Sequence, residues 1–377
     1  MKKHSQMQII FLFLFVFIFT SCSLFIGDKN FAPENDLKIF LKKEIENGVK
    51  QIILPEGSFK INSTILLPDD IHLQGNLRGT TLVLSEEYSG PIITNSSWEK
   101  GNKNIKVSNI KFDGLSELHK ISDNNYHKRA YAKSLSQVDN VAIYFKNVES
   151  AEISRSSFIN FKNEAIFLSS SRNITVLSND IRNCSQKAHV NDWAQGCIYL
   201  RHSNKCLISE NHIKDCYEGG IVAGFDSHNN SIILNEVTNT PSGEGVFIGC
   251  GTENIVAFNK IHDTSKSDLG SGAGIALSVP PSIDKLKFPS NSYIIVHNQI
   301  SSTGGSGISV YRSDNNLISF NSVTDVNLNQ KSRRGGISIY ESEKIIISNN
   351  KINVTNCPPI GIQKSKGISE IDNQIKK

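Results

Sequence analysis

The sequence predicts an all-β fold, a single parallel β-helix with three strands in each coil and about 10 to 12 coils. One marker of this fold is a set of eight asparagines, each two residues before an Ile or a Val. They are Asn179, Asn211, Asn235, Asn259, Asn298, Asn321, Asn350 and Asn373. Successive positions differ by 32, 24, 24, 39, 23, 29 and 23 residues. A base period of about 23 residues indicates a unit that buries its apolar face only by stacking on the next unit.

A glycine followed by Ile or Val is the second marker, and it stands before each new apolar run. These glycines are Gly220, Gly245, Gly274, Gly307, Gly336 and Gly361. One unit, residues 198–220, reads IYLRHSNKCLISENHIKDCYEGG. Apolar and polar residues alternate in its stretches 198–200, 206–209 and 212–216, which is a strand period. Gly, Asn and Ser separate these stretches, and none is long enough for a helix.

Stacking of the coils explains why asparagine recurs at one place. Coils stacked in register about 4.8 Å apart bring equivalent side chains above one another. Each asparagine amide then bonds the backbone or the next asparagine. Asparagine also tolerates the left-handed backbone of a tight corner. The eight residues therefore predict an asparagine ladder at one corner of the coil.

This pattern resembles the right-handed parallel β-helix superfamily typified by pectate and pectin lyases, from about residue 36 to the C-terminus. In that superfamily the ladder lies between the second and third strands of a coil. The resemblance implies strands at 198–201, 206–209 and 213–216, with Asn211 as the ladder corner. The corner before Gly220 is then the third turn, where loops vary in length. Because many activities share this scaffold, the resemblance implies a fold rather than a reaction.

Residues 1–21 predict the signal peptide of an exported bacterial lipoprotein. A positive start precedes an unbroken apolar run over 9–19, and small residues then precede Cys22. This resembles a lipoprotein signal in which Cys22 becomes the lipidated first residue, with Phe19 where Leu is usual. An uncleaved anchor and ordinary secretion are the alternatives. Lipidation predicts attachment to a membrane of the cell envelope, periplasmic or at the cell surface, with residues 22–35 as a tether.

The remaining chain, 36–377, predicts one β-helix domain whose first element, 36–50, is a capping helix. Leu37, Phe40, Leu41 and Ile45 recur at helical spacing, between a polar N-cap at Asn35 or Asp36 and Gly48. A cap at this end protects strand edges that would otherwise aggregate. The last coil, from residue 362, is expected to be partial and to have no such helix. Either a partner, such as another copy in an oligomer, covers it, or its lysines protect the edge.

Charge and cysteine content narrow the function classes. The net charge is +4, and without Lys2 and Lys3 it is 38 − 36 = +2, too near neutral to predict nucleic-acid binding. Cys184 and Cys216 each follow a third-strand Ile by three residues. We expect them to be stacked thiols, with a disulfide between them as the alternative, because in-register stacking gives a poor Cβ direction. No cysteine spacing suggests zinc.

The outward face of the first strands predicts a groove for an acidic polysaccharide. In superfamily members that cleave polysaccharides, the groove runs along this sheet. Residues between buried apolar positions point outward. In three early coils they are Tyr144 and Lys146, Phe167 and Ser169, and Tyr199 and Arg201. Aromatic faces stack on sugar rings, and Lys and Arg bind carboxylates. An ordinary exposed β-face is the alternative reading.

Loops beside this face supply further polar groups. The third-turn loop 185–196 carries His189, Asp192 and Trp193. The other candidates near Arg201 are His202, Tyr217, Glu218 and Glu244. An insertion over 115–137 interrupts the coil pattern. Long loops in a compact repeat often carry function.

Three functions fit these residues. Lyase or C5-epimerase action on a uronate needs a cation at the carboxylate and a base at C5. The catalytic candidates are Arg201, Lys146, His189, Asp192 and Glu218; Tyr144, Phe167, Trp193, Tyr199, Tyr217, His202 and Glu244 are expected to bind substrate. The second is a non-catalytic, adhesin-like glycan-binding lipoprotein. The third is a hydrolase using Asp192 with Glu218 or Glu244.

No cofactor is required by these functions, although Ca²⁺ is compatible with uronate chemistry. No tight cluster of acidic residues predicts a metal site, and Asp226 is only a weak ligand candidate. The motif sets of polygalacturonase-type hydrolases and alginate epimerases are also absent from the sequence.

Overall fold

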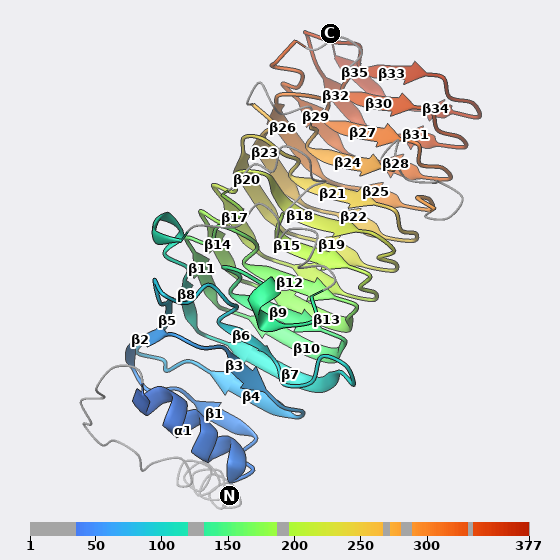
Figure 1. Ribbon diagram of the computed structural model, residues 1–377. Helices are drawn as coiled ribbons and strands as arrows, with labels where there is room; N and C mark the ends of the chain where they lie inside the picture. Colours follow the sequence, from blue (N-terminus) through green and yellow to red (C-terminus); the bar gives the residue numbers. More distant parts are fainter. Residues whose placement is uncertain are drawn as a thin grey trace, which may run out of the picture. The chain divides into compact units, whose positions relative to one another are not determined.

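The computed structural model describes residues 35–119, 132–186, 196–266, 272–279, 289–330 and 335–376. The predicted signal peptide and Cys22 lie outside these ranges, as do His189, Asp192 and Trp193. Within them, three parallel sheets of 12, 12 and 11 strands wind into a right-handed β-helix, which confirms the predicted fold (Figure 1). Each coil gives one strand to each sheet, and we call these sheets A, B and C.

Sheet A contains the second strand of each coil. Its members are β1 (Gln51–Ile53), β4 (Ile71–Gln74), β7 (Asn102–Ser108), β10 (Val148–Ser154), β13 (Arg172–Leu177), β16 (Leu207–Ser209), β19 (Ser231–Ile233), β22 (Ile255–Ala257), β25 (Ile294–Val296), β28 (Leu317–Ser319), β31 (Ile346–Ser348) and β34 (Ser369–Ile371). It faces the right-hand side of Figure 1.

Sheet B contains the third strands. They are β2 (Gly57–Ile61), β5 (Thr80–Leu84), β8 (Lys111–Asp113), β11 (Ser157–Ile159), β14 (Asp180–Arg182), β17 (His212–Lys214), β20 (Glu236–Thr240), β23 (Lys260–Thr264), β26 (Gln299–Thr303), β29 (Ser322–Thr324), β32 (Lys351–Asn353) and β35 (Gln374–Lys376).

Sheet C contains the first strands, whose outward face the sequence predicts to be functional. They are β3 (Ile65–Leu67), β6 (Ile93–Asn95), β9 (Ile143–Lys146), β12 (Ile166–Ser169), β15 (Gly196–Arg201), β18 (Gly219–Gly224), β21 (Val246–Gly249), β24 (Ile275–Ser278), β27 (Ile308–Tyr311), β30 (Ile337–Tyr340) and β33 (Ile360–Gln363). Two 3₁₀ turns, Ser116–Leu118 and Leu135–Gln137, lie between β8 and β9.

The asparagine ladder lies at the corner between sheets A and B, as predicted. Asn235 shows the repeating pattern: its Nδ2 donates to Oδ1 of Asn259 at 3.0 Å, and its Oδ1 accepts from Nδ2 of Asn211 at 2.9 Å. Backbone N–H groups also donate to the next rung, as Asn211 does to Asn235 at 3.0 Å. These bonds satisfy buried backbone groups that the turn removes from the sheets. The ladder therefore fixes the register of the coils.

The predicted N-terminal capping helix is α1 (Asn35–Glu46), at one end of the stack (Figure 1). It buries Leu37 and Leu41 in the main core. At its end, Gly48 has φ +74°, its N–H donates to the Ile45 carbonyl, and the Val49 N–H donates to the Glu44 carbonyl. This is the Schellman pattern that glycine favours. No helix in the described ranges is both long and apolar enough to cross a membrane.

The last described coil is more complete than the sequence indicates. It contributes β33, β34 and β35 to the three sheets, rather than a partial coil. Ile362 and Ile375, which continue rows of buried residues, are 39% and 46% exposed.

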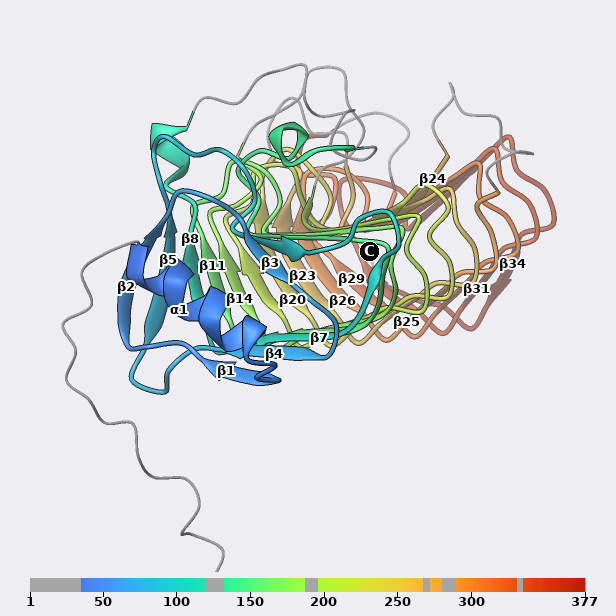
Figure 2. The same ribbon diagram turned by 60° about the horizontal axis from the view of Figure 1, so that its bottom comes forward.

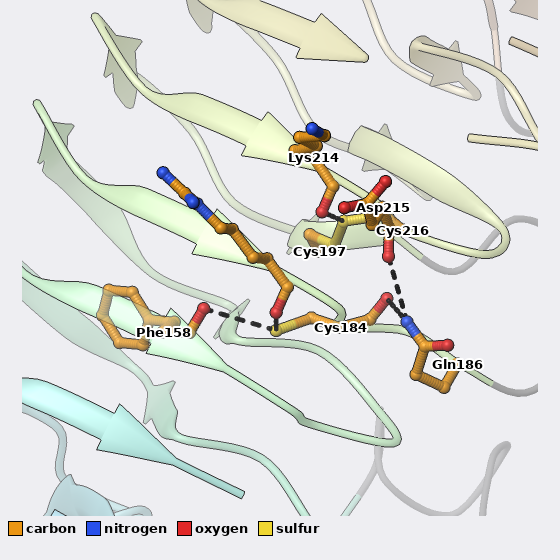
Figure 3. Close-up of a disulfide and its surroundings, with 8 residues drawn as sticks. Phe158, Cys184, Gln186, Cys197, Lys214, Asp215 and Cys216 are labelled. Atoms are coloured by element: carbon orange, nitrogen blue, oxygen red, sulfur yellow. Dashed lines mark hydrogen bonds between the residues drawn. A yellow bond between two sulfur atoms is a disulfide. The ribbon is translucent and has the colours of Figure 1, made fainter. Parts of the chain in front are cut away.

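The prediction that Cys184 and Cys216 are stacked thiols is wrong. Cys216 forms a disulfide with Cys197 (Figure 3), and Cys184 is a buried free cysteine. Cys197 begins the first strand of a coil and Cys216 follows the third strand of the same coil. The coil brings their Cα atoms to 6.5 Å, within the range of disulfides. Cys184 lies one coil earlier, and its burial raises the pKa of its thiol to about 12.

Candidate functional site

The outward face of sheet C is covered over the early coils. Tyr144, Phe167 and Tyr199 point away from the main core, as predicted, but they are 0%, 1% and 2% exposed. They form a second apolar cluster with Val222, beneath three residues of the segment before β9: Ala132, Val138 and Val141. These rings are therefore closed to sugars in the described arrangement, because residues of the segment before β9 cover them. The two 3₁₀ turns between β8 and β9, in green, lie at the top of Figure 2.

Contacts between the rings hold this second cluster together. Tyr144 lies 5.1 Å from Trp98 and 5.2 Å from Phe167, and Phe167 lies 4.9 Å from Tyr199, measured between ring centroids. Lys146 donates to the carbonyl of Ala132, and its Nζ lies 5.5 Å from the Trp98 ring centroid. Burial lowers the pKa of Lys146. The face remains partly exposed further along, at Phe247, Tyr311 and Tyr340.

Arg201 ends β15 and is held against the protein. Its guanidinium carbon lies 4.1 Å from the ring centroid of Phe225, and its Nη1 lies 3.4 Å from the Tyr199 hydroxyl. The side chain is only 6% exposed. Lys146 lies in the same column as Arg201, two coils earlier, with Ser169 between them. The backbone positions of Lys146 and Arg201 are therefore about 10 Å apart. Both cations therefore lie where strands of sheet C end.

His202 follows Arg201 and belongs to a more open group. Its Nδ1 lies 4.0 Å from Oδ2 of Asp226, and their side chains are 29% and 54% exposed. Burial lowers the pKa of His202, and Arg201 lowers it further, against the opposing effect of Asp226. The lowered pKa favours the uncharged form of the His202 imidazole, which is the form that acts as a general base.

His228 orients Asp226. Nδ1 of His228 accepts from the backbone N–H of Thr252 at 3.0 Å, so the ring proton is on Nε2. That nitrogen donates to Oδ1 of Asp226 at 2.7 Å. Phe225 and Asp226 both have left-handed backbone, with φ 48° and 64°. The sequence Gly-Phe-Asp-Ser-His was the available signal for this group, although it suggested a metal ligand rather than an acid–base pair.

Carboxylates lie at the opposite margin, where strands of sheet C begin. The residue two positions before the first buried Ile of such a strand faces the following coil: a Cβ added to Gly196 would lie 2.7 Å from Val222, and Ser306 Oγ lies 2.8 Å from Ser338 Oγ. By the same register Glu164, which is fully buried, faces the position of Tyr199. The sequence analysis did not identify Glu164, yet a carboxylate at a position that is glycine in the next two coils, Gly196 and Gly219, was a usable signal.

Glu218 and Glu244 occupy this acidic margin, and Tyr217 is half-buried beside Glu218. Glu218 is 7% exposed, and a Cβ added to Gly272 would lie 3.0 Å from Oε1 of Glu244. Arg201 pairs with Gly224, which is 224 − 218 = 6 residues from Glu218, or about 20 Å along the strand. The structure therefore groups Lys146, Arg201 and His202 at one margin and Glu218 and Glu244 at the other.

Metal binding receives no support from the described ranges, where no three His, Cys, Asp or Glu side chains form a group able to hold an ion. Asp226 instead accepts a hydrogen bond from His228 and lies 4.0 Å from His202. The compatibility of Ca²⁺ with this protein stays a prediction.

Comparison with known proteins supports the fold. A family model described as a right-handed beta helix region matches residues 75–237. The chain is thus a right-handed parallel β-helix protein, with the fold that typifies the pectate lyase-like superfamily. No curated protein matches it in sequence.

Several solved structures share the fold at low identity. The A-module of the mannuronan C-5 epimerase AlgE4 of Azotobacter vinelandii has a TM-score of 0.64 and 12% identity, with 90% of each chain covered. The surface adhesin PfbA of Streptococcus pneumoniae has a TM-score of 0.69 and 14% identity, covering 90% of this chain and 86% of its own. An exopolygalacturonase of Thermotoga maritima has a TM-score of 0.58 and 11% identity, covering 90% and 88%. This degree of likeness establishes architecture alone.

Proposed function

We propose that this is an exported, lipid-anchored protein of the cell envelope that acts on an acidic, uronate-containing polysaccharide as a lyase or C5-epimerase. The observation that carries the proposal is the group formed by Arg201, His202, Asp226 and His228 at the margin of sheet C. It combines a permanent cation, an uncharged imidazole and an oriented carboxylate. Removal of a proton beside a carboxylate needs this combination.

The proposed reaction starts at C5 of the uronate. Arg201 neutralises the sugar carboxylate, and the His202 imidazole accepts the C5 proton as the C–H electron pair moves into the carboxylate. In a lyase, that electron pair then forms the C4=C5 double bond, the C4–O bond breaks, and the leaving oxygen takes a proton. In an epimerase, a proton returns to C5 from the opposite face. Solvent water supplies that proton, since Tyr199 is only 2% exposed and does not reach the sugar.

An adhesin-like binding protein is the second candidate. The burial of Tyr144, Phe167 and Tyr199 favours it, because these rings cannot stack on sugar in the described arrangement. Binding would then use the partly exposed later coils, including Tyr311 and Tyr340. A hydrolase acting through Asp192 with Glu218 or Glu244 is the third candidate, motivated by the carboxylate margin.

Incubating the protein with polyuronates in D₂O distinguishes the candidates. We expect either an unsaturated uronate, detected by ultraviolet absorbance, or deuterium at C5, detected by nuclear magnetic resonance. Arg201→Ala and His202→Gln should each abolish the signal, because they remove the cation and the base. New reducing ends without either signal would select the hydrolase, and binding without turnover would select the adhesin.

The matched control is His212→Gln on sheet B. His212 also lies beside an aspartate, with Nδ1 3.6 Å from Oδ1 of Asp180, but it faces away from sheet C. Its activity should equal that of the unchanged protein. Equal losses in His202→Gln and His212→Gln would overturn the assignment of His202.

The pH dependence gives a second test of His202. Since its pKa is lowered from the ordinary value of 6.5, its base form persists into more acidic solution. The acidic limb of kcat/KM should therefore lie below pH 6.5. Asp226→Asn removes the group that raises this pKa, so the limb should move to still lower pH. A limb that stays in place or moves upward would contradict the role of His202 as base.

A further inference from the structure

An exposed apolar surface runs along the outside of the later coils. At the corner between sheets A and B, Leu234, Phe258, His297 and Phe320 occupy one column. The rings of Phe258 and His297 stack at 4.8 Å between centroids, and those of His297 and Phe320 at 5.0 Å. Leu234, Phe258 and Phe320 are 53%, 53% and 54% exposed. Stacking within the column thus leaves half of each apolar side chain in solvent.

A second apolar column lies beside the first, on the outward face of sheet A. Ile255, Ile294, Leu317 and Ile346 pair in register across four successive coils. Ile294 and Ile346 are 38% and 45% exposed. We call the two columns together the apolar strip; its strands are β19, β22, β25, β28 and β31 on the right of Figure 1.

The strip is not a general property of this face. The same column of sheet A carries His72, Lys106 and Glu152 in the early coils, paired in register. Lys106 and Glu152 form an ion pair at 3.0 Å. The face is therefore polar near α1 and apolar in the later coils. A contiguous apolar patch of a few hundred Å² on a monomer is often functional.

The backbone conformation of the corner column also indicates a functional surface. Leu234, Phe258, His297 and Phe320 all have left-handed backbone, with φ 59°, 58°, 57° and 57°. The same corner carries Glu210 and Asn349 in flanking coils. Bulky apolar residues are outliers in this conformation, whereas asparagine tolerates it. Burial does not offset the backbone strain at these exposed apolar residues. We therefore infer that they serve a contact outside the fold.

The chemistry of the strip selects its occupant. Neither column contains Lys, Arg, Asp or Glu. A sugar chain needs several hydrogen-bonding groups, and the His297 imidazole is the only polar side chain in the strip. The footprint is about 20 Å by about 12 Å, or roughly 240 Å², from the spacing of coils and residues. A stable protein–protein interface needs about 800 Å² from each partner. A lipid surface needs no hydrogen bonds, and the strength of binding to it scales with the apolar area buried.

We propose that the apolar strip contacts the acyl region of a membrane and lays the β-helix lengthwise on it. The chain outside the described residues is long enough to permit this. From Cys22 to Asn35 the 13 steps span at most about 45 Å. From β1 to β19 the six coil steps span about 29 Å. The proposal rests on the lipid anchor of the proposed function, and apolar area buried in the membrane adds to the attachment that this anchor supplies.

The full chain, produced with its N-terminal residues and reconstituted in phosphatidylcholine vesicles, tests the proposal. Phe320→Trp places a fluorescent ring on the strip, and Ser301→Trp places one on β26 of sheet B in neighbouring coils. Bromine atoms on the lipid acyl chains quench indoles that reach them. We expect a blue shift and loss of emission for Phe320→Trp, and no change for Ser301→Trp beyond that of native Trp98 and Trp193.

Every other outcome overturns the proposal. Equal quenching of the two variants would show that the strip has no special contact with lipid, and so would absence of quenching in both. A blue shift of the Phe320→Trp emission that depends on protein concentration rather than on lipid would indicate that a second copy of the protein covers the strip. Turnover of polysaccharide is a separate readout, so the failure of this proposal is distinguishable from the failure of the proposed reaction.

Discussion

Replacing Asn235 by alanine is expected to lower the free energy of unfolding by about 3 to 5 kcal/mol, because buried hydrogen-bonding groups lose their partners at about 1 to 3 kcal/mol each. Asn235 is 1% exposed. Its Nδ2 donates to the carbonyl oxygens of Ile208 and Ile233, and its Oδ1 accepts the backbone N–H of Asn211. Alanine removes all of these bonds and leaves their backbone partners in an enclosed site.

Urea unfolding measures this loss as a lower midpoint with an unchanged slope. Asn353→Ala is the control, because Asn353 is a half-buried asparagine on the outside of β32, away from the ladder. Its midpoint should remain near that of the unchanged protein. Similar midpoints for the two variants would mean that the ladder adds no more than an ordinary surface asparagine.

Removal of the disulfide between Cys197 and Cys216 is the second large effect. The bond closes a loop with a sequence separation of 19 residues. Loss of a cross-link of this length costs about 3 kcal/mol through the greater entropy of the unfolded chain. Cys197→Ser with Cys216→Ser should therefore unfold at lower urea concentration, as should the unchanged protein under reducing conditions.

Reductant provides the internal control for this prediction. It should have no effect on the double variant, which has no such bond to lose. Cys184 should resist alkylation in the folded protein, since its thiol is fully buried and its pKa is raised to about 12. Equal stability of the oxidised and reduced proteins would contradict a stabilising role for the bond.

Regular features were predictable because each coil repeats the same local rules. The recurrence of asparagine two residues before an Ile predicted the ladder, and alternation predicted which side of each strand faces the core. Tyr144 and Tyr199 do point away from that core. The helix was predicted over 36–50 and ends at Glu46, because Gly48 adopts the left-handed backbone that terminates it.

Features that depend on one segment meeting another were not predictable. The burial of Tyr144 depends on Ala132, Val138 and Val141 folding back over sheet C, and no repeat governs that insertion. Which cysteine lies close enough to Cys216 for a disulfide depends on how far the chain advances along the β-helix axis in one coil. The roles proposed for Arg201 and His202 stay predictions, although the structure supplies the environment that makes them chemically reasonable.

The spacing of residues along the chain predicts the coil: its period, its three strands, its ladder and the inward or outward direction of each side chain. These follow from spacing along one chain, because in-register stacking converts a sequence period into a spatial column. Which outward side chains reach solvent depends on the folded structure. It covers Tyr144, Phe167 and Tyr199 on sheet C and leaves Phe258 and Phe320 about half exposed on another face. Exposure depends on what lies above a residue, and that is set by insertions outside the repeat.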